Sequence, residues 1–380
     1  MNATTIYGGV VLITNGLYYP VNEIAVSNAV SIQSVNGPDV TIIDGGGAHR
    51  CFNLGSSAST VVGLTITNGY ISAGNGGGVY CANKSPTVSR CMLSGNITTE
   101  NGGGIYYGVV DNTILVGNSA RSGGGFVKTT AYNCTVISNS ATENGGGIYA
   151  GNVNNSIVWY NHAGNSGNNL HSSTVKASCS PDVTHGIAGN ITNAPLFVAM
   201  TNGNYHLVTN SPCIDAGENS LIDGALDIDG IPRPLDADND GITLVDMGCY
   251  EIMNIDSDSD KDNMPDGWEL DNGLDPATAD AEQDKDNDWY NNYSEYIAGT
   301  DPDDASSVFD LSYIMSTNGF VINWNSVTSR TYSVLWTDDL LTNSFHILET
   351  NIVYPGGSYT DTVHGTESEG FYKVDVQFNR

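Results

Sequence analysis

Short β-branched and aliphatic runs alternate with glycine-rich turns along the first half of the chain. Four segments repeat a Gly triplet followed by two apolar residues: 75–80, 101–106, 122–127 and 144–149. A second phrase ends in an asparagine at positions 96, 118, 139 and 161, with spacings of 22, 21 and 22 residues. A Gly triplet inside a helix costs roughly 1 kcal/mol per residue, whereas a short period with β-branched runs suits one coil of a parallel β-helix. The pattern therefore predicts a stack of about nine such coils over residues 1 to about 205.

Alignment of the coils predicts which side chains face the interior. A small residue lies five positions before each repeated asparagine, and these residues are Cys91, Thr113, Cys134 and Ser156. Successive rungs are about 4.8 Å apart, so Cys91 and Cys134 would lie two rungs apart, too far for a disulfide. We expect this column to be packed inside the coils, with both cysteines as free thiols.

Strand and turn signals also occur before the repeats, at residues 30–35 and 40–47, and the first clear copy of the repeat covers residues 63–69. These phrases resemble the right-handed parallel β-helix repeats of bacterial polymorphic outer-membrane and related surface proteins. Three later segments look like the terminal cap of bacterial choice-of-anchor β-helix proteins: residues 211–217, 227–233 and 245–251. The resemblance covers about half of the chain and implies an exported, surface-associated protein with little established chemistry.

The end of the chain has a different pattern. Residues 320–324, 331–336 and 371–376 alternate apolar and polar side chains, and turn residues separate them. Alternation with a period of two is typical of strands that bury one face. A small β-sandwich is therefore predicted over residues 308–380.

Charge changes the picture in the stretch between these regions. The 380 residues hold 42 Asp and Glu against 12 Lys and Arg, a formal net charge of -30. Residues 251–307 alone carry 18 of these acids and 2 of the bases. So acidic a protein repels the phosphates of nucleic acids and of anionic membranes, and neither is expected as a partner. The local density of acids indicates either a disordered linker or bound cations.

Two registered copies of a twelve-residue loop favour bound calcium. Such a loop needs oxygen ligands at positions 1, 3, 5, 7, 9 and 12, with a backbone carbonyl at position 7 and a glutamate at position 12. In the first copy these are Asp258, Asp260, Asp262, the Met264 carbonyl, Asp266 and Glu269. In the second copy, 26 residues later, they are Asp284, Asp286, Asp288, the Tyr290 carbonyl, Asn292 and Glu295. The pair resembles thrombospondin type 3 and dockerin-like calcium repeats.

Position 6 of such a loop requires a positive φ and normally holds glycine. Here it holds Asn263 and Trp289, so we expect the second loop to be strained or weaker. A third cluster, Asp236, Asp238 and Asp240, has no glutamate at position 12. It is interpreted as an ordinary turn, with a metal site as the alternative.

The sequence thus predicts an all-β fold in three domains. A right-handed parallel β-helix with its C-terminal cap spans residues 1–252, a tandem Asp-rich calcium-binding module spans 253–307, and a small C-terminal β-sandwich spans 308–380. We expect calcium to act mainly on folding, because crowded carboxylates repel one another until a divalent cation neutralises them. The ion would then stiffen the joint between β-helix and sandwich.

Catalysis on the β-helix is the alternative function. Polysaccharide lyases and glycoside hydrolases share this scaffold and place paired acids, or carboxylates, calcium and a basic residue, on one outer face. The catalytic candidates are Glu100, Arg121 and Glu143 on successive rungs, with Asp111 as a further acid. A stabilising charge ladder is the plainer interpretation of an arginine between two carboxylates.

An aromatic column is the candidate ligand surface. Tyr80, Tyr106 and Tyr149 each follow the buried aliphatic residue of their repeat, so strand alternation turns them outward, with Val127 interrupting the column. Such a strip can stack on sugar rings. Packing between neighbouring rungs is the plainer explanation.

The remaining features bear on location. The sequence has no transmembrane run, and its first five residues lack the marks of a secretory signal. We expect a signal to have been removed, because calcium sites of this kind function outside the cell. The predicted function is that of an exported bacterial surface or secreted protein, non-catalytic, for adhesion, surface display or glycan contact. Its expected cofactor is calcium and its expected partner is a glycan or cell-surface component.

Overall fold

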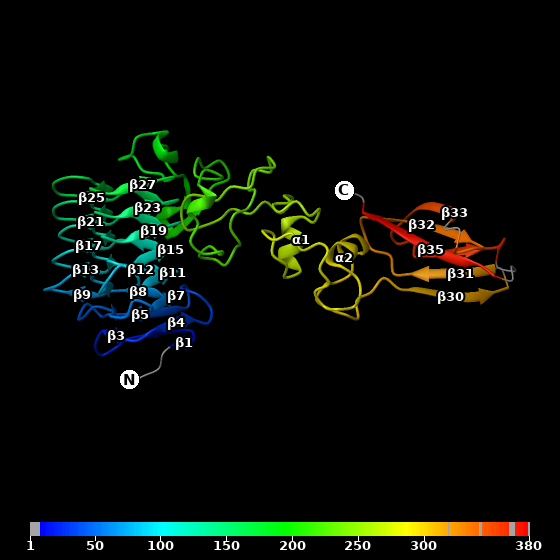
Figure 1. Cartoon of the computed structure of the whole chain (residues 1–380), viewed down its shortest axis with the longest axis horizontal. Coiled ribbons are helices and arrows are strands. Elements are labelled where there is room, and N and C mark those ends of the chain that lie inside the picture. Colours follow the sequence, from blue (N-terminus) through cyan, green and yellow to red (C-terminus); the bar gives the residue numbers. More distant parts are fainter. Residues whose placement is uncertain (1–7, 318, 342–343, 365–368, 379–380) are drawn as a thin grey trace. The chain divides into compact units, whose positions relative to one another are not determined.

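The structure is a computed structural model that describes residues 8–317, 319–341, 344–364 and 369–378. The chain divides into two compact units, Met1–Ser259 and Asp260–Arg380 (Figure 1). The first unit is a solenoid of parallel strands with a cap segment. The second unit contains two short helices followed by antiparallel strands.

The strands of the first unit stack into four parallel ladders, and each coil of the chain passes from one ladder to the next (Figure 1). The longest ladder contains β1 (Gly9–Ile13), β4 (Val30–Ser34), β7 (Thr60–Val62), β11 (Thr87–Ser89), β15 (Val109–Asp111), β19 (Thr130–Tyr132), β23 (Asn152–Asn154) and β27 (Thr174–Lys176). The second contains β2 (Gly16–Tyr18), β5 (Thr41–Asp44), β8 (Thr65–Thr67), β12 (Met92–Ser94), β16 (Ile114–Val116), β20 (Thr135–Ile137) and β24 (Ile157–Trp159). The third contains β3 (Ile24–Val26), β6 (Phe52–Leu54), β10 (Val79–Cys81), β14 (Ile105–Tyr106), β18 (Phe126–Val127), β22 (Ile148–Tyr149) and β26 (Leu170–His171). The shortest contains β9 (Tyr70–Ile71), β13 (Ile97–Thr98), β17 (Ser119–Ala120), β21 (Ser140–Ala141) and β25 (His162–Ala163).

Equivalent residues of successive repeats pair in register. Val79 pairs with Ile105, and Ile105 with Phe126. The predicted parallel β-helix is therefore confirmed. The longest ladder has eight strands, fewer than the predicted nine or so coils. After Lys176 the parallel pairing continues as isolated bridges, from Ile157 to Cys179 and from Cys179 to Ile191, with the 3₁₀ turn η1 (Ile187–Gly189) between the last two residues. The chain then forms the antiparallel pair β28 (Phe197–Ala199) and β29 (Asn204–Leu207), joined by the 3₁₀ turn η2 (Met200–Asn202).

The interior of the coils is filled by aliphatic side chains and by the predicted column of small residues. Cys91, Thr113, Cys134 and Ser156 are all completely buried, which confirms that the column points inward. The Thr113 hydroxyl accepts a hydrogen bond from the backbone N–H of Cys91 at 3.2 Å, and the Ser156 hydroxyl accepts one from Cys134 at 3.0 Å. The hydroxyls therefore satisfy backbone donors that the turn leaves unpaired inside the coil.

The repeated asparagines form a second buried column. The side-chain amide of Asn96 donates to Oδ1 of Asn118 at 3.0 Å, Asn118 donates to Asn139 at 2.9 Å, and Asn139 donates to Asn161 at 3.0 Å. The ladder ends at Asn169, whose Oδ1 accepts from Asn161 at 3.1 Å. Each Oδ1 also accepts the backbone N–H of the preceding asparagine, for example Asn96 N to Asn118 at 3.0 Å. The 22-residue period of the sequence thus places one amide per coil at the same turn.

The three cap segments meet in a network of buried charges. Arg233 and Glu251 form an ion pair at 3.1 Å, with side chains 0% and 1% exposed. The Glu251 carboxylate accepts the backbone N–H groups of Leu235 and Asp246 at 3.0 and 3.1 Å. Asp246 in turn accepts the backbone N–H of Asp215 at 2.8 Å. The cap also includes the 3₁₀ turn η3 (Asn219–Leu221), and its apolar side chains pack on the outer face of the ladder that contains β16 and β20.

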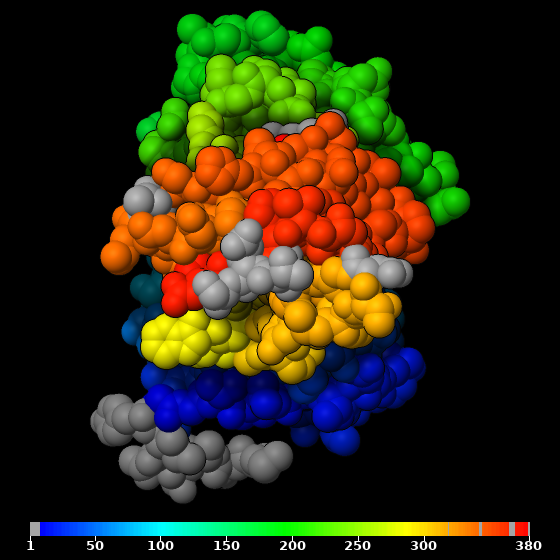
Figure 2. Space-filling model, turned by 90° about the vertical axis from the view of Figure 1, so that its right-hand side faces the viewer, coloured from blue at the N-terminus to red at the C-terminus, as the bar shows by residue number. Residues whose placement is uncertain are grey.

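The second unit begins with α1 (Asp266–Asp271) and α2 (Asn292–Ala298) and continues as two antiparallel three-stranded sheets, coloured orange to red in Figure 2. One sheet contains β30 (Leu311–Ser316), β31 (Gly319–Trp324) and β34 (Ser358–Asp361). The other contains β33 (His346–Val353), β32 (Arg330–Thr337) and β35 (Phe371–Phe378). The predicted strands at 320–324, 331–336 and 371–376 are therefore confirmed. Ile322, Trp324, Tyr332 and Val334 form the buried core that the two sheets share.

The helical segment of the second unit packs against its sheets. Tyr296 of α2 packs against Phe378 of β35, with ring centroids 5.2 Å apart and the rings tilted by 57°. Arg330 is buried and donates to the carbonyls of Tyr296 and Ile297 at the end of α2. Because positive charge at a helix C-terminus complements the unpaired carbonyls there, this arginine anchors the acidic module to the strands.

Candidate metal centres

The first twelve-residue loop runs from Asp258 into α1 and brings its carboxylates together. Oxygens of Asp258, Asp260 and Asp262 lie within 4.8 Å of one another. Asn263, at the glycine position, has φ 78°, the left-handed value that this position of the loop requires. The sequence therefore folds locally into the turn that its pattern predicts.

Glu269, at position 12, is the most informative residue of this loop. Its side chain is completely buried, and neither carboxylate oxygen has a hydrogen-bond partner. Burial, reinforced by the neighbouring carboxylates of Asp260, Asp262 and Asp266, raises the pKa of Glu269 to about 9. A buried carboxylate without a donor is costly unless a cation balances it. The loop therefore presents two bare oxygens at the place where a calcium ligand is expected.

Asp280 is a further carboxylate at this site that the loop pattern does not include. Its oxygen lies within 4.8 Å of oxygens of Asp262 and Glu269. Asp262 holds it there, because Oδ2 of Asp262 accepts the backbone N–H groups of Asp280 and Ala281 at 3.0 and 2.8 Å. No spacing rule for a twelve-residue loop finds this residue, since it lies eleven positions after the loop ends.

The second loop repeats the arrangement before α2. Oxygens of Asp284, Asp286 and Asp288 lie within 4.8 Å of one another. Glu295 is 1% exposed, and its Oε2 has no partner, while Oε1 accepts from Thr300 at 3.2 Å. Burial and the three aspartates raise the pKa of Glu295 to about 7. Glu295 has one carboxylate oxygen without a hydrogen-bond partner, whereas Glu269 has two. The two loops are therefore similar but not equivalent.

Trp289 occupies the glycine position of the second loop with φ 84°. A positive φ is unusual for a bulky residue and costs energy. Its side chain is 94% exposed, and its backbone N–H donates to Asp284 at 2.9 Å. The local backbone strain expected from the sequence is therefore present.

The remaining predicted ligands lie where their loops enter the helices. Met264 is completely buried in the small apolar core of this segment, and Asp266, the first residue of α1, is also completely buried. Asn292, the first residue of α2, is 1% exposed and its Oδ1 has no partner. Tyr290 has an exposed side chain. Each residue occupies its expected position in the sequence of the loop.

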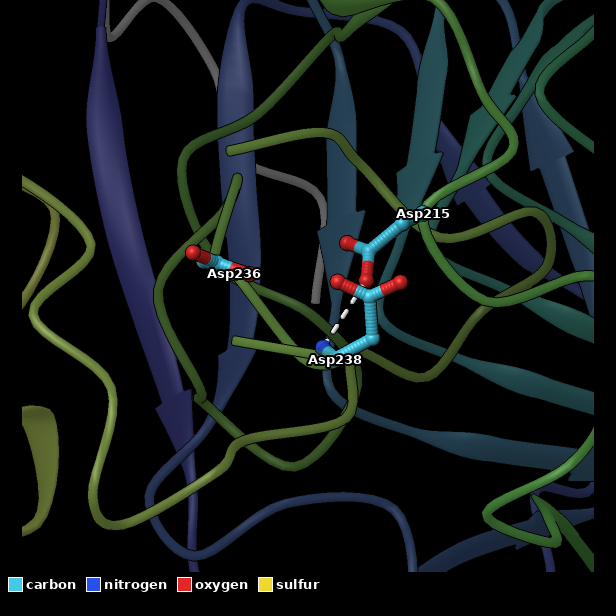
Figure 3. A group of neighbouring side chains, drawn as sticks. All are labelled: Asp215, Asp236 and Asp238. Atoms are coloured by element: carbon cyan, nitrogen blue, oxygen red, sulfur yellow. Dashed lines mark hydrogen bonds between the residues drawn. The ribbon is translucent and has the colours of Figure 1, made fainter. Parts of the chain in front are cut away.

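A third group of acids lies in the first unit, in the cap (Figure 3). It joins Asp236 and Asp238 with Asp215, and not with Asp240 as the sequence suggested. Asp236 accepts the backbone N–H groups of Asp240 and Gly241 at 3.2 and 2.8 Å, and Oδ2 of Asp215 accepts the N–H of Asp238 at 3.1 Å. The bonds of Asp236 are those of a turn, whereas the Asp215–Asp238 bond joins two cap segments, and Oδ1 of Asp215 is buried without a partner. The turn and the metal site both stay predictions for this cluster.

The three catalytic candidates align on successive rungs. The backbone N–H of Arg121 donates to the carbonyl of Glu100 at 2.7 Å, and that of Glu143 to the carbonyl of Arg121 at 2.8 Å. The Arg121 guanidinium lies 3.2 Å from the Glu100 carboxylate, with both side chains nearly half exposed. Among the described residues Arg121 forms an ion pair with Glu100 and none with Glu143, so one pair of the predicted charge ladder is present. An exposed pair of this kind has small energetic value.

The tyrosine column is built as the repeats predict. Register pairs Tyr80 with Tyr106, and Val127 with Tyr149. The rings of Tyr80 and Tyr106 stack at a centroid distance of 5.9 Å and an interplanar angle of 4°, and Tyr149 stacks on His171 at 5.4 Å. The faces of these rings therefore pack on neighbouring rungs, which is the plainer of the two interpretations.

Asp111 is the one acidic candidate that is buried. It is 5% exposed and accepts hydrogen bonds from Ser89 at 2.8 Å and from Asn112 at 3.2 Å. Burial raises its pKa from 3.8 to about 6. Between about pH 4 and pH 6, Asp111 is therefore protonated in the folded state and ionised in the unfolded chain. The free energy of unfolding consequently falls as the pH rises through this window.

Replacing Asp111 by asparagine should remove this penalty. We expect D111N to stabilise the first unit at pH 8 by at most about 3 kcal/mol, the equivalent of two pKa units, and to leave its stability at pH 4 nearly unchanged. Thermal unfolding of both variants at the two pH values measures this difference. An equal gain at pH 4 and pH 8 would show that the charge of Asp111 is not the cause.

No helix among the described residues is long and apolar enough to cross a membrane. Comparison of the chain with protein-family models, with curated proteins and with solved structures finds no match. The interpretation of the two loops therefore depends on their own geometry.

Proposed function

We propose that residues 258–295 bind two calcium ions, one in each twelve-residue loop, and that this binding completes the folding of this segment. The observation that carries the proposal is Glu269, a completely buried carboxylate whose two oxygens have no partner. Glu295 repeats the feature in the second loop with one bare oxygen. Two buried, unsatisfied carboxylates at the same position of two registered loops are explained together by one kind of ligand.

The donor set favours calcium over other metals. The ligands are carboxylate, amide and carbonyl oxygens, with no histidine or cysteine in either loop. Oxygen-only ligand sets suit Ca²⁺ and Mg²⁺, and a flexible loop with a glutamate at position 12 suits the larger ion.

Electrostatics couples the ion to folding. The first three aspartates of each loop lie within 4.8 Å of one another, and Asp262 also lies within this distance of Glu269 and Asp280. Lys285 is a base within this segment. Its ammonium group donates to the carbonyl of Asn272 at 2.8 Å and forms an ion pair with Asp303 at 3.4 Å. Like charges at such distances repel strongly when partly desolvated. A divalent cation reverses the sign of this interaction, so its binding energy contributes directly to the stability of the fold.

The proposed cellular role follows from the ion and from the resemblance of the repeats. Calcium loops of moderate affinity are filled outside the cell. We propose an exported, non-catalytic protein that serves adhesion, surface display or glycan contact, with the solenoid as a rigid scaffold.

Calorimetric titration of the full chain, after treatment with a chelator, tests the calcium proposal. We expect two calcium ions per chain and a rise in the melting temperature of the second unit. At calcium about 100 times the Kd, each site contributes about 2.7 kcal/mol. Magnesium at the same concentration is the matched control and should stabilise less. Absence of both heat and thermal stabilisation with calcium would refute the proposal.

A further inference from the structure

A cavity of about 290 Å³ lies in the first unit, where the cap approaches the outer face of the solenoid. Met92 of β12 and Ile114 of β16 line it from the solenoid, and Ile228 and Tyr250 line it from the cap. The loop 36–39 between β4 and β5 supplies the third side. Five segments of the sequence thus enclose one hollow near the size at which small-ligand pockets begin, roughly 300 Å³.

Opposite charges line this cavity without neutralising each other. Arg90 and Asp39 both contribute to its wall. Among the described residues, neither side chain forms an ion pair or a hydrogen bond. An arginine presents donors in a planar fork and a carboxylate presents acceptors. The cavity therefore offers both kinds of hydrogen-bonding group to whatever enters it.

A third charged group is held in place by the cap. Oδ2 of Asp229 lies 2.8 Å from Nε2 of His206. The other ring nitrogen of His206 lies 2.8 Å from Oδ1 of Asn204, and its ring stacks on Tyr250 at a centroid distance of 3.8 Å. The orientation of Asp229 at the cavity is therefore fixed through His206, which does not line the cavity and is itself held by Asn204 and Tyr250.

We propose that this cavity binds a neutral saccharide residue. Such a ligand has an apolar face that matches Met92 and Ile114, and neighbouring hydroxyls that both donate to carboxylates and accept from Arg90. An anion would meet Asp39 and Asp229, and a cation would meet Arg90. The site deepens the glycan-contact part of the proposed function and rests on it. It does not depend on calcium, because every lining residue belongs to the first unit.

Saturation-transfer NMR and calorimetry with glucose, galactose, mannose, N-acetylglucosamine and cellobiose test the proposal on the full chain. We expect at least one sugar to bind with a Kd on the order of 1 mM. R90Q should weaken binding at least about tenfold, because a hydrogen bond to a charged group is lost. D39N, in a surface loop, should also weaken it and guards against a folding defect in R90Q. K84Q, which changes an exposed lysine elsewhere on the solenoid, should leave the affinity unchanged.

Three outcomes would overturn the proposal: no binding by any sugar in the panel, binding that R90Q and D39N leave unchanged, or binding of glycine in place of the sugars, which would assign a zwitterionic ligand. The titration is repeated in chelator. Sugar binding that persists there supports the cavity even if the calcium proposal fails. Calcium binding without any sugar binding refutes the cavity alone.

Discussion

Replacement of Glu269 by glutamine should abolish calcium binding at the first loop. It should lower the stability of the protein with calcium and raise its stability without calcium. With saturating calcium, we expect E269Q to lose the contribution of one site, about 3 kcal/mol at 100 times the Kd. Without calcium, E269Q should melt at a higher temperature than the wild type at pH 8, because the raised pKa of Glu269 makes its carboxylate take up a proton on folding and the neutral amide does not have this cost. Titration calorimetry and thermal unfolding in calcium and in chelator measure both effects.

Asp271 supplies the matched control for this prediction. It lies on the same helix, α1, and is exposed. D271N removes one negative charge from the segment without touching the buried oxygens, so it should retain two calcium ions. Retention of both ions by E269Q would show that Glu269 is not a ligand. A lower melting temperature than the wild type in chelator would contradict the predicted gain in stability without calcium.

Removal of one side-chain amide from the asparagine ladder should destabilise the first unit more than substitution of an exposed side chain does. Asn118 accepts from the backbone and side-chain nitrogens of Asn96 and donates to the Leu93 carbonyl and to Asn139. Each buried group left without a partner costs about 1–3 kcal/mol. We therefore expect N118A to lower the free energy of unfolding by at least about 4 kcal/mol, and thermal or denaturant unfolding measures the loss.

Asn152 is the control for the ladder. It lies in β23 with an exposed side chain. N152A should change the stability by no more than about 0.5 kcal/mol. A similarly small effect for N118A would contradict the view that the asparagine side chains satisfy the buried hydrogen-bonding groups of the turns.

The sequence alone was sufficient to predict the solenoid. A 22-residue period can bury its apolar face only against another copy of itself, so Val79, Ile105, Phe126 and Ile148 had to stack. The period also determined that Cys91 and Cys134 point inward. The positions of Glu269 and Glu295 followed from the loop pattern in the same way, because both loops count residues from their first aspartate.

Only the tertiary structure decided which groups from distant segments meet. Asp280 approaches Glu269 because backbone N–H groups bind Asp262, and nothing in the spacing shows this. Arg90 and Asp229 line one cavity only because the cap packs across the coils. Local periodicity specifies neighbours at constant separation along the chain, whereas a contact between segments that do not repeat depends on how their surfaces pack.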